Sequence, residues 1–135
     1  MALPKVHRLR RRQDFSKVYQ AGLRRHTPNL TLRALRQSKL ILDDDLGANK
    51  EPVPTSIGIS IGLKVSKRAV IRNRIKRRIR SAMQTLLPYL PTGWQIVIVV
   101  KPSATQCSYG QFLQELKQLL VSAEVINEHQ GRSVF

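Results

Sequence analysis

The sequence is poor in acidic and aromatic residues and contains a single cysteine. Its 135 residues include 8 Asp and Glu against 24 Lys and Arg, and only 5% are aromatic. One cysteine, Cys107, excludes an internal disulfide and is typical of a reducing compartment. The longest aliphatic run, Ile96–Val100, is far shorter than the ~20 apolar residues of a membrane-spanning helix. The N-terminus lacks the apolar segment of a signal peptide, so we expect a cytoplasmic protein, or an organelle-matrix protein, with no membrane partner.

The positive charge is concentrated in two segments of the chain. The net charge is +16, with 41% hydrophobic residues, enough for one compact domain over residues 1–135. Residues 1–36 carry ten basic side chains and one acid, Asp14, and residues 56–101 carry ten basic side chains and no acid. Solvated surfaces normally mix both signs of charge. The two segments therefore predict a polyanionic partner, with nucleic acid favoured over an anionic membrane.

Hydrophobic periodicity predicts a mixed sheet covered by helices. The expected order is helix, strand, strand, helix, strand, helix. These elements are expected at 12–21, 30–35, 56–65, 67–87, 94–101 and from Ser108, where Gln111 completes a capping box. Alternation places Gly58, Ser60 and Gly62 on one face of the third element, where either a ligand or a packed helix approaches closely. Residues 36–55 are expected to form a long surface loop.

The helix over 67–87 combines a core stripe with a basic outer surface. Six apolar residues recur at helical spacing, namely Ile71, Ile75, Ile79, Ala82, Met83 and Leu86. Asn73, Arg77 and Arg80 lie opposite them, while Arg72 and Arg78 lie at the stripe edges, where we expect their guanidinium groups to reach outward. Arginine suits phosphate because its planar group presents five donors. Asn73 could read a base edge or a ribose hydroxyl, or brace a neighbouring arginine.

No arrangement of residues indicates a catalytic centre or a metal site in the protein itself. The three histidines, His7, His26 and His129, are scattered and lack metal-ligand spacing. The acidic run Asp43–Asp45 is a weak candidate for a metal site, because adjacent carboxylates converge poorly without further ligands. A solvated loop is the favoured interpretation of that run. We therefore expect no catalytic residues and no cofactor bound by the protein alone.

The segment Ser66–Arg80 resembles the signature of the protein subunit of bacterial ribonuclease P. The matching pattern is Ala69, then Arg72-Asn73-Arg74, an aliphatic residue, Lys76-Arg77, and a further aliphatic-basic pair. Residues 9–22 resemble the N-terminal helix of the same family, and 57–67 resemble its central strand. Residues 96–102 resemble its last strand, and the chain from Ser108 onward resembles its last helix. A basic helix alone is weak evidence, whereas four matching segments in this order are strong evidence.

The resemblance implies a fold and a function. The fold is α+β, related to domain two of ribosomal protein family five of the small subunit, with a left-handed crossover around the basic helix. The function is that of a protein cofactor in removing the 5′ leader from precursor tRNA, a hydrolysis performed by a catalytic RNA with bound magnesium. The partners implied are that RNA and the single-stranded leader, and not DNA.

The resemblance also assigns residues to two binding surfaces. The catalytic RNA is expected to contact Arg72, Asn73, Arg74, Lys76, Arg77 and Arg80. The leader is expected in a cleft beside the sheet lined by Phe15 and Tyr19 and flanked by Lys64, Lys67 and Arg68. Stacking aromatics beside cations suit a single strand of any sequence.

Alternatives remain open at several of these positions. Phe15 and Tyr19 could simply pack the first helix, and Arg78 could be a helix-edge cation without an RNA contact. The basic cluster Arg8, Arg10, Arg11 and Arg12 either contacts RNA or belongs to a mobile arm that includes residues 1–8. Two other classes of protein fit less well, namely a ribosomal or chaperone-like RNA binder without a processing role, and a DNA binder. The loop 36–55 is longer than the family pattern leads us to expect.

Overall fold

The computed structural model describes residues 7–9, 11–36, 54–123 and 125. Three α-helices, α1 (Arg12–Ala21), α3 (Ala69–Leu86) and α4 (Tyr109–Ser122), accompany four strands. The strands are β1 (Leu23–His26), β2 (Leu30–Arg36), β3 (Ser56–Ser60) and β4 (Trp94–Val100). Short 3₁₀ turns follow α3 at Leu87–Tyr89 and β4 at Pro102–Gln106. The predicted α+β class is confirmed, whereas the Asp43–Asp45 run and most of the 36–55 loop lie outside the described residues.

The four strands form one mixed sheet in the order β1-β2-β4-β3. β2 pairs antiparallel with both β1 and β4, and β3 pairs parallel with β4. Parallel neighbours need a crossover connection, and α3 supplies it between β3 and β4. The left-handedness of this crossover stays a prediction.

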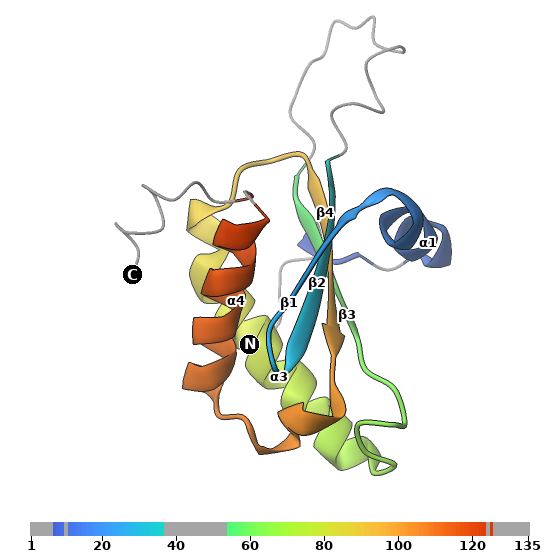
Figure 1. Cartoon of the computed structure of the whole chain (residues 1–135), viewed down its shortest axis with the longest axis vertical. Coiled ribbons are helices and arrows are strands. Elements are labelled where there is room, and N and C mark those ends of the chain that lie inside the picture. The colour runs from blue at the N-terminus through green and yellow to red at the C-terminus, as the bar shows by residue number, and fades with distance from the viewer. Residues whose placement is uncertain (1–6, 10, 37–53, 124, 126–135) are drawn as a thin grey trace, which may run out of the picture.

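The two faces of the sheet are covered unequally (Figure 1). Helices α3 and α4 lie against one face and α1 lies against the other. Along β4, Ile96 and Ile98 belong to the large core with α3 and α4, whereas Val97 and Val99 pack with α1. Both faces of β4 are therefore covered, which explains why its sequence is apolar except for Gln95.

The two larger helices pack as their sequences predict. On α3, Ile75, Ile79, Ala82, Met83 and Leu86 are buried, and Ile71 packs at the core margin. On α4, the buried residues are Phe112, Leu116, Leu119 and Leu120. The predicted capping box is confirmed, because Ser108 Oγ accepts from Gln111 N at 3.2 Å and Gln111 Oε1 accepts from Ser108 N at 2.8 Å.

The structure corrects the predicted strands in two places. β1 was not predicted, since its four residues include Arg24, Arg25 and His26 and show no apolar alternation. It forms because the turn after His26 folds the chain back onto β2, where Thr27 N donates to Leu30 O at 2.9 Å. The third predicted element is shorter than expected, because β3 ends at Ser60, opposite Val99, and the chain turns between Gly62 and Val65.

Residues 7–9 lie along the outer edge of β3. Arg8 forms an isolated parallel bridge with Ile57, and Leu9 N donates to Ile57 O at 2.9 Å. His7 Nδ1 lies 2.7 Å from Thr55 O, and Leu9 is buried. These three residues therefore close an exposed sheet edge instead of extending away from the protein.

Candidate nucleic-acid interface

The outer surface of α3 is cationic because its inner stripe is fixed in the core. Asn73, Arg74 and Arg77 are exposed, and Lys76 and Arg80 are half-buried. Val70, Asn73, Arg77 and Arg80 line an open hollow of about 430 Å³ on one side of the helix. Three of the six residues predicted to contact RNA, Asn73, Arg77 and Arg80, thus line one hollow on a rigid helix.

Two arginines of α3 turn back toward the protein instead of reaching outward. Arg72 Nη1 donates to Ser66 O at 2.9 Å, and Arg78 Nη1 donates to Cys107 O at 2.9 Å. The expectation that both guanidinium groups reach outward was therefore wrong. In each case the acceptor is a backbone carbonyl that lies outside the helices and strands and within reach of the arginine. Arg78 thereby ties α3 to the segment that precedes α4.

Few carboxylates compensate these cations within the described residues. Asp14 on α1 and Glu115 on α4 are the acids that the structure describes. Glu115 is already engaged, since its carboxylate accepts from the Thr27 hydroxyl, from Asn29 N at 3.2 Å and from Asn29 Nδ2 at 2.5 Å. The positive charge of α3 therefore has no counter-charge within the described protein, which favours an anionic partner.

Phe15 packs against the sheet at a glycine. A Cβ atom on Gly58 would lie 2.9 Å from Phe15 Cε1, which is closer than real Cβ contacts allow, and 3.2 Å from Leu9 Cβ, which is tighter than most. Phe15 is half-buried beside the small cluster of Leu9, Val18 and Val97. Of the two alternatives for Gly58, a ligand or a packed helix, the structure thus shows the packed helix, namely α1. Phe15 itself stays partly accessible.

Tyr19 lies one turn further along α1 and is held by Arg33 of β2. The Arg33 guanidinium carbon lies 5.0 Å from the centroid of the Tyr19 ring, and Arg33 Nη1 donates to Tyr19 O at 2.8 Å. The Tyr19 side chain is 37% exposed. Tyr19 is therefore an exposed ring whose orientation is fixed by a cation–π contact.

Two functional candidates on this face were missed by the sequence reasoning. Arg33 is paired directly with Arg24 of β1 in the sheet register, so the two cations share the α1 face. The alternating pattern of residues 30–35 could have placed Arg33 on the face of the sheet opposite the core. The position of Arg24 could not be found in this way, because β1 was not predicted from the sequence. Arg33 brings positive charge to Tyr19, and Arg24 lies opposite Arg33 in the sheet.

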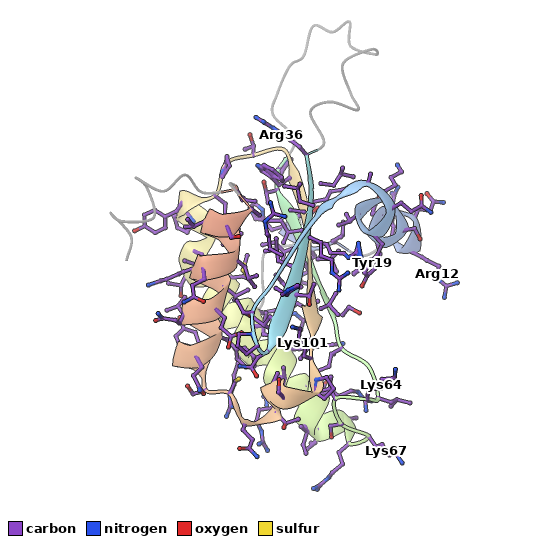
Figure 2. The ribbon with its side chains drawn as sticks, viewed as in Figure 1. Arg12, Tyr19, Arg36, Lys64, Lys67 and Lys101 are labelled. Atoms are coloured by element: carbon purple, nitrogen blue, oxygen red, sulfur yellow. The ribbon has the colours of Figure 1, made fainter. Side chains whose placement is uncertain are left out.

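The predicted flanking cations lie on the segment between β3 and α3. Lys64, Lys67 and Arg68 are all exposed, whereas Val65 between them is buried at 8% exposure. Figure 2 shows Lys64 beside the lower end of the sheet and Lys67 below it, with Tyr19 higher on the same side. The chain thus places these cations directly before the start of α3, and Lys64 and Lys67 lie lower than Tyr19 on this side of the protein.

The described residues contain no cluster of three or more His, Cys, Asp or Glu side chains that could hold a metal ion. Cys107 is buried, and burial raises the pKa of its thiol, with the negative charge of Glu115 raising it further. A buried thiol with a raised pKa is a poor nucleophile. None of the helices that the structure describes is both long and apolar enough to cross a membrane.

Comparison with known proteins decides the family of this cationic fold. The family model Ribonuclease P matches residues 3–124. The chain belongs to the ribonuclease P protein family. Curated relatives named "Ribonuclease P protein component" include one from Cyanothece sp. (strain PCC 7425 / ATCC 29141), 55% identical over 93% of this chain and 98% of the relative. One from Nostoc sp. (strain PCC 7120 / SAG 25.82 / UTEX 2576) is 51% identical over 96% and 99%.

The fold of the ribonuclease P protein family is also found among solved structures. A mutant RNase P protein from Staphylococcus aureus, described as defective in mRNA degradation activity, superposes with a TM-score of 0.73 at 24% identity. That alignment covers 90% of this chain and 92% of the other. As a ribonuclease P protein component, the chain is a subunit of a tRNA-processing nuclease and partners an RNA subunit.

Proposed function

We propose that this protein binds the catalytic RNA of ribonuclease P through α3 and binds the 5′ leader of precursor tRNA on the α1 side of the sheet. The observation that carries the proposal is the outer surface of α3, where Asn73, Arg74 and Arg77 are exposed and no described acid balances them. Arginine side chains on a fixed helix present donors in a constant pattern. Such a pattern suits a folded RNA, whose phosphates also occupy fixed positions.

The leader surface is supported by a different set of contacts. Phe15 and Tyr19 present ring surface, Arg33 fixes Tyr19, and Arg24 adds a second cation on the same face. Bases of any sequence stack on aromatic rings, and nearby cations attract the backbone. The exposed Lys64, Lys67 and Arg68 extend the cationic surface toward α3.

The chemistry of hydrolysis is assigned to the RNA subunit. The described residues offer Asp14 and Glu115 on different helices, and Glu115 is engaged by Thr27 and Asn29. Magnesium prefers several oxygen ligands around one position, and these carboxylates do not supply them. We therefore infer that magnesium is held by the RNA and that this protein positions RNA and substrate, in the cytoplasm where precursor tRNA is made.

The testing experiment is cleavage of a precursor tRNA at low magnesium concentration by a bacterial ribonuclease P RNA, with and without this protein, and by the protein alone. We expect cleavage at the 5′ end only when protein and RNA are combined. The R77M/R80M variant should weaken binding to the RNA and reduce the salt dependence, by about 0.7–0.9 in the logarithmic slope for each lost phosphate contact. K117M, which removes one cation from α4, is the control for the loss of a cation outside α3.

Two outcomes would contradict the proposal. Cleavage by the protein alone would place a catalytic centre in the chain. Binding to the RNA without any gain in cleavage would favour the alternative of a ribosomal or chaperone-like RNA binder without a processing role.

A further inference from the structure

Arg72 differs from the other predicted RNA-contacting residues because it binds the segment that precedes its helix. The side chain is half-buried, and its Nη1 donates to Ser66 O at 2.9 Å. Ser66 Oγ accepts from Arg68 N at 3.1 Å, and Val65 N donates to Gly62 O at 3.1 Å. These bonds close residues 62–68, which we name the β3–α3 loop, onto the first turn of α3.

The β3–α3 loop carries a concentrated positive charge that needs such a restraint. Lys64, Lys67 and Arg68 are exposed within five residues, and their side chains donate no hydrogen bond to any residue that the structure describes. Like charges this close repel one another. The loop is held by the buried Val65 side chain and by the Arg72 bond.

The chemistry of the guanidinium group allows Arg72 to serve two partners. It has five N–H donors in one plane, and the bond to Ser66 uses one of them. The remaining donors can bind a phosphate of the RNA subunit while the bond to Ser66 persists. A methionine or an alanine at this position could do neither.

We propose that Arg72 is a positioning residue that couples the surface for the catalytic RNA to the surface for the leader. Arg72 fixes the β3–α3 loop. Lys64 and Lys67 therefore contact the precursor leader when α3 is bound to the catalytic RNA. This inference rests on the proposed function. Coupling between two binding sites is reciprocal. If binding of the catalytic RNA strengthens leader binding through Arg72, leader binding strengthens binding of the catalytic RNA by the same factor.

The test compares R72M with R77M in the complete holoenzyme. Each variant removes one cation from α3, but Arg77 makes no side-chain hydrogen bond in the described structure. Dissociation constants are measured for a precursor tRNA with and without its leader, and their ratio gives the leader discrimination. We expect R72M to reduce this ratio by about tenfold. R77M should leave the ratio within about twofold of wild type.

A double-mutant cycle tests whether Arg72 acts through the loop. If it does, K64M should cost little further discrimination in the R72M background, whereas K64M and R77M should add independently. Should R72M fail to fold, R72K replaces it. R72K keeps the charge but loses the planar group, so RNA affinity should stay near wild type while the leader ratio falls several-fold.

The outcomes separate this inference from the function on which it rests. A wild-type holoenzyme without leader discrimination would overturn the proposed leader surface itself. A wild-type holoenzyme with discrimination that R72M and R72K retain in full, or an additive R72M/K64M cycle, would overturn only the coupling role of Arg72.

Discussion

The two faces of the sheet differ in how completely helices cover them. The face under α3 and α4 carries the large core, which includes fully buried Phe112, Ile79 and Leu116. The α1 face buries Leu9, Val18 and Val97, with Phe15, Leu35 and Val99 partly covered. The first face therefore provides most of the stability. The second keeps partly exposed apolar and cationic side chains available for a partner.

The largest expected effect comes from truncating matched phenylalanines on the two faces. Phe112→Ala should lower the free energy of unfolding by about 3–5 kcal/mol, because it leaves a cavity in the fully buried core. Phe15→Ala should cost about 1–2 kcal/mol, because the ring is already partly solvated. Urea denaturation of both variants measures the difference. Equal losses in the free energy of unfolding would show that the α1 face contributes as much to the core as the face under α3 and α4.

A smaller loss of stability is expected where the β1–β2 turn meets α4. Glu115→Gln removes an acceptor from a site where the carboxylate binds Thr27 and Asn29, and should cost about 1–3 kcal/mol. Asp14→Asn on α1 is the control, since no side-chain hydrogen bond to Asp14 is found in the described structure. Thermal denaturation should separate the two variants, and similar melting temperatures would argue against the Glu115 site.

Two tyrosines of nearly equal exposure test whether leader binding belongs to the α1 face. Tyr19 is 37% exposed on α1, and Tyr109 is 38% exposed on α4, where its hydroxyl lies 2.8 Å from the Thr85 hydroxyl. Tyr19→Ala should weaken binding of leader-bearing precursor by about 1–3 kcal/mol through lost stacking. Tyr109→Ala should not change the difference between leader-bearing and leaderless substrates. An effect of Tyr109 as large as that of Tyr19 would contradict the assignment.

The smallest expected effect concerns the buried thiol of the core face. Burial, aided by Glu115, raises the pKa of Cys107 in the folded protein above its unfolded value. In alkaline solution the unfolded chain therefore loses the thiol proton first, and the free energy of unfolding falls as pH rises through that window. Cys107→Ala should remove this slope, which urea denaturation between neutral and alkaline pH can measure. Rapid alkylation of the native thiol at neutral pH would also contradict the burial.

Several features of this protein follow from local sequence patterns alone. The apolar stripe of α3, the capping box at Ser108 and the nearly continuous apolar sequence of β4 depend on periodicity and nearest neighbours. The cationic surface of α3 follows from the same stripe, because fixing one side of a helix exposes the other. The exposure of Asn73, Arg74 and Arg77 could thus be predicted without a structure.

Other features were decided by contacts between segments far apart in the sequence. β1 exists because β2 offers it a partner, and Phe15 packs where Gly58, 43 residues away in the sequence, leaves room for its ring. Arg78 turns inward because the backbone carbonyl of Cys107, 29 residues along the chain, lies within reach, whereas the Arg72 bond to Ser66 spans only six residues. Sequence periodicity predicts on which face of its own helix or strand a side chain lies. Only the tertiary structure determines which group it meets there, and so which donors of an arginine remain available to RNA.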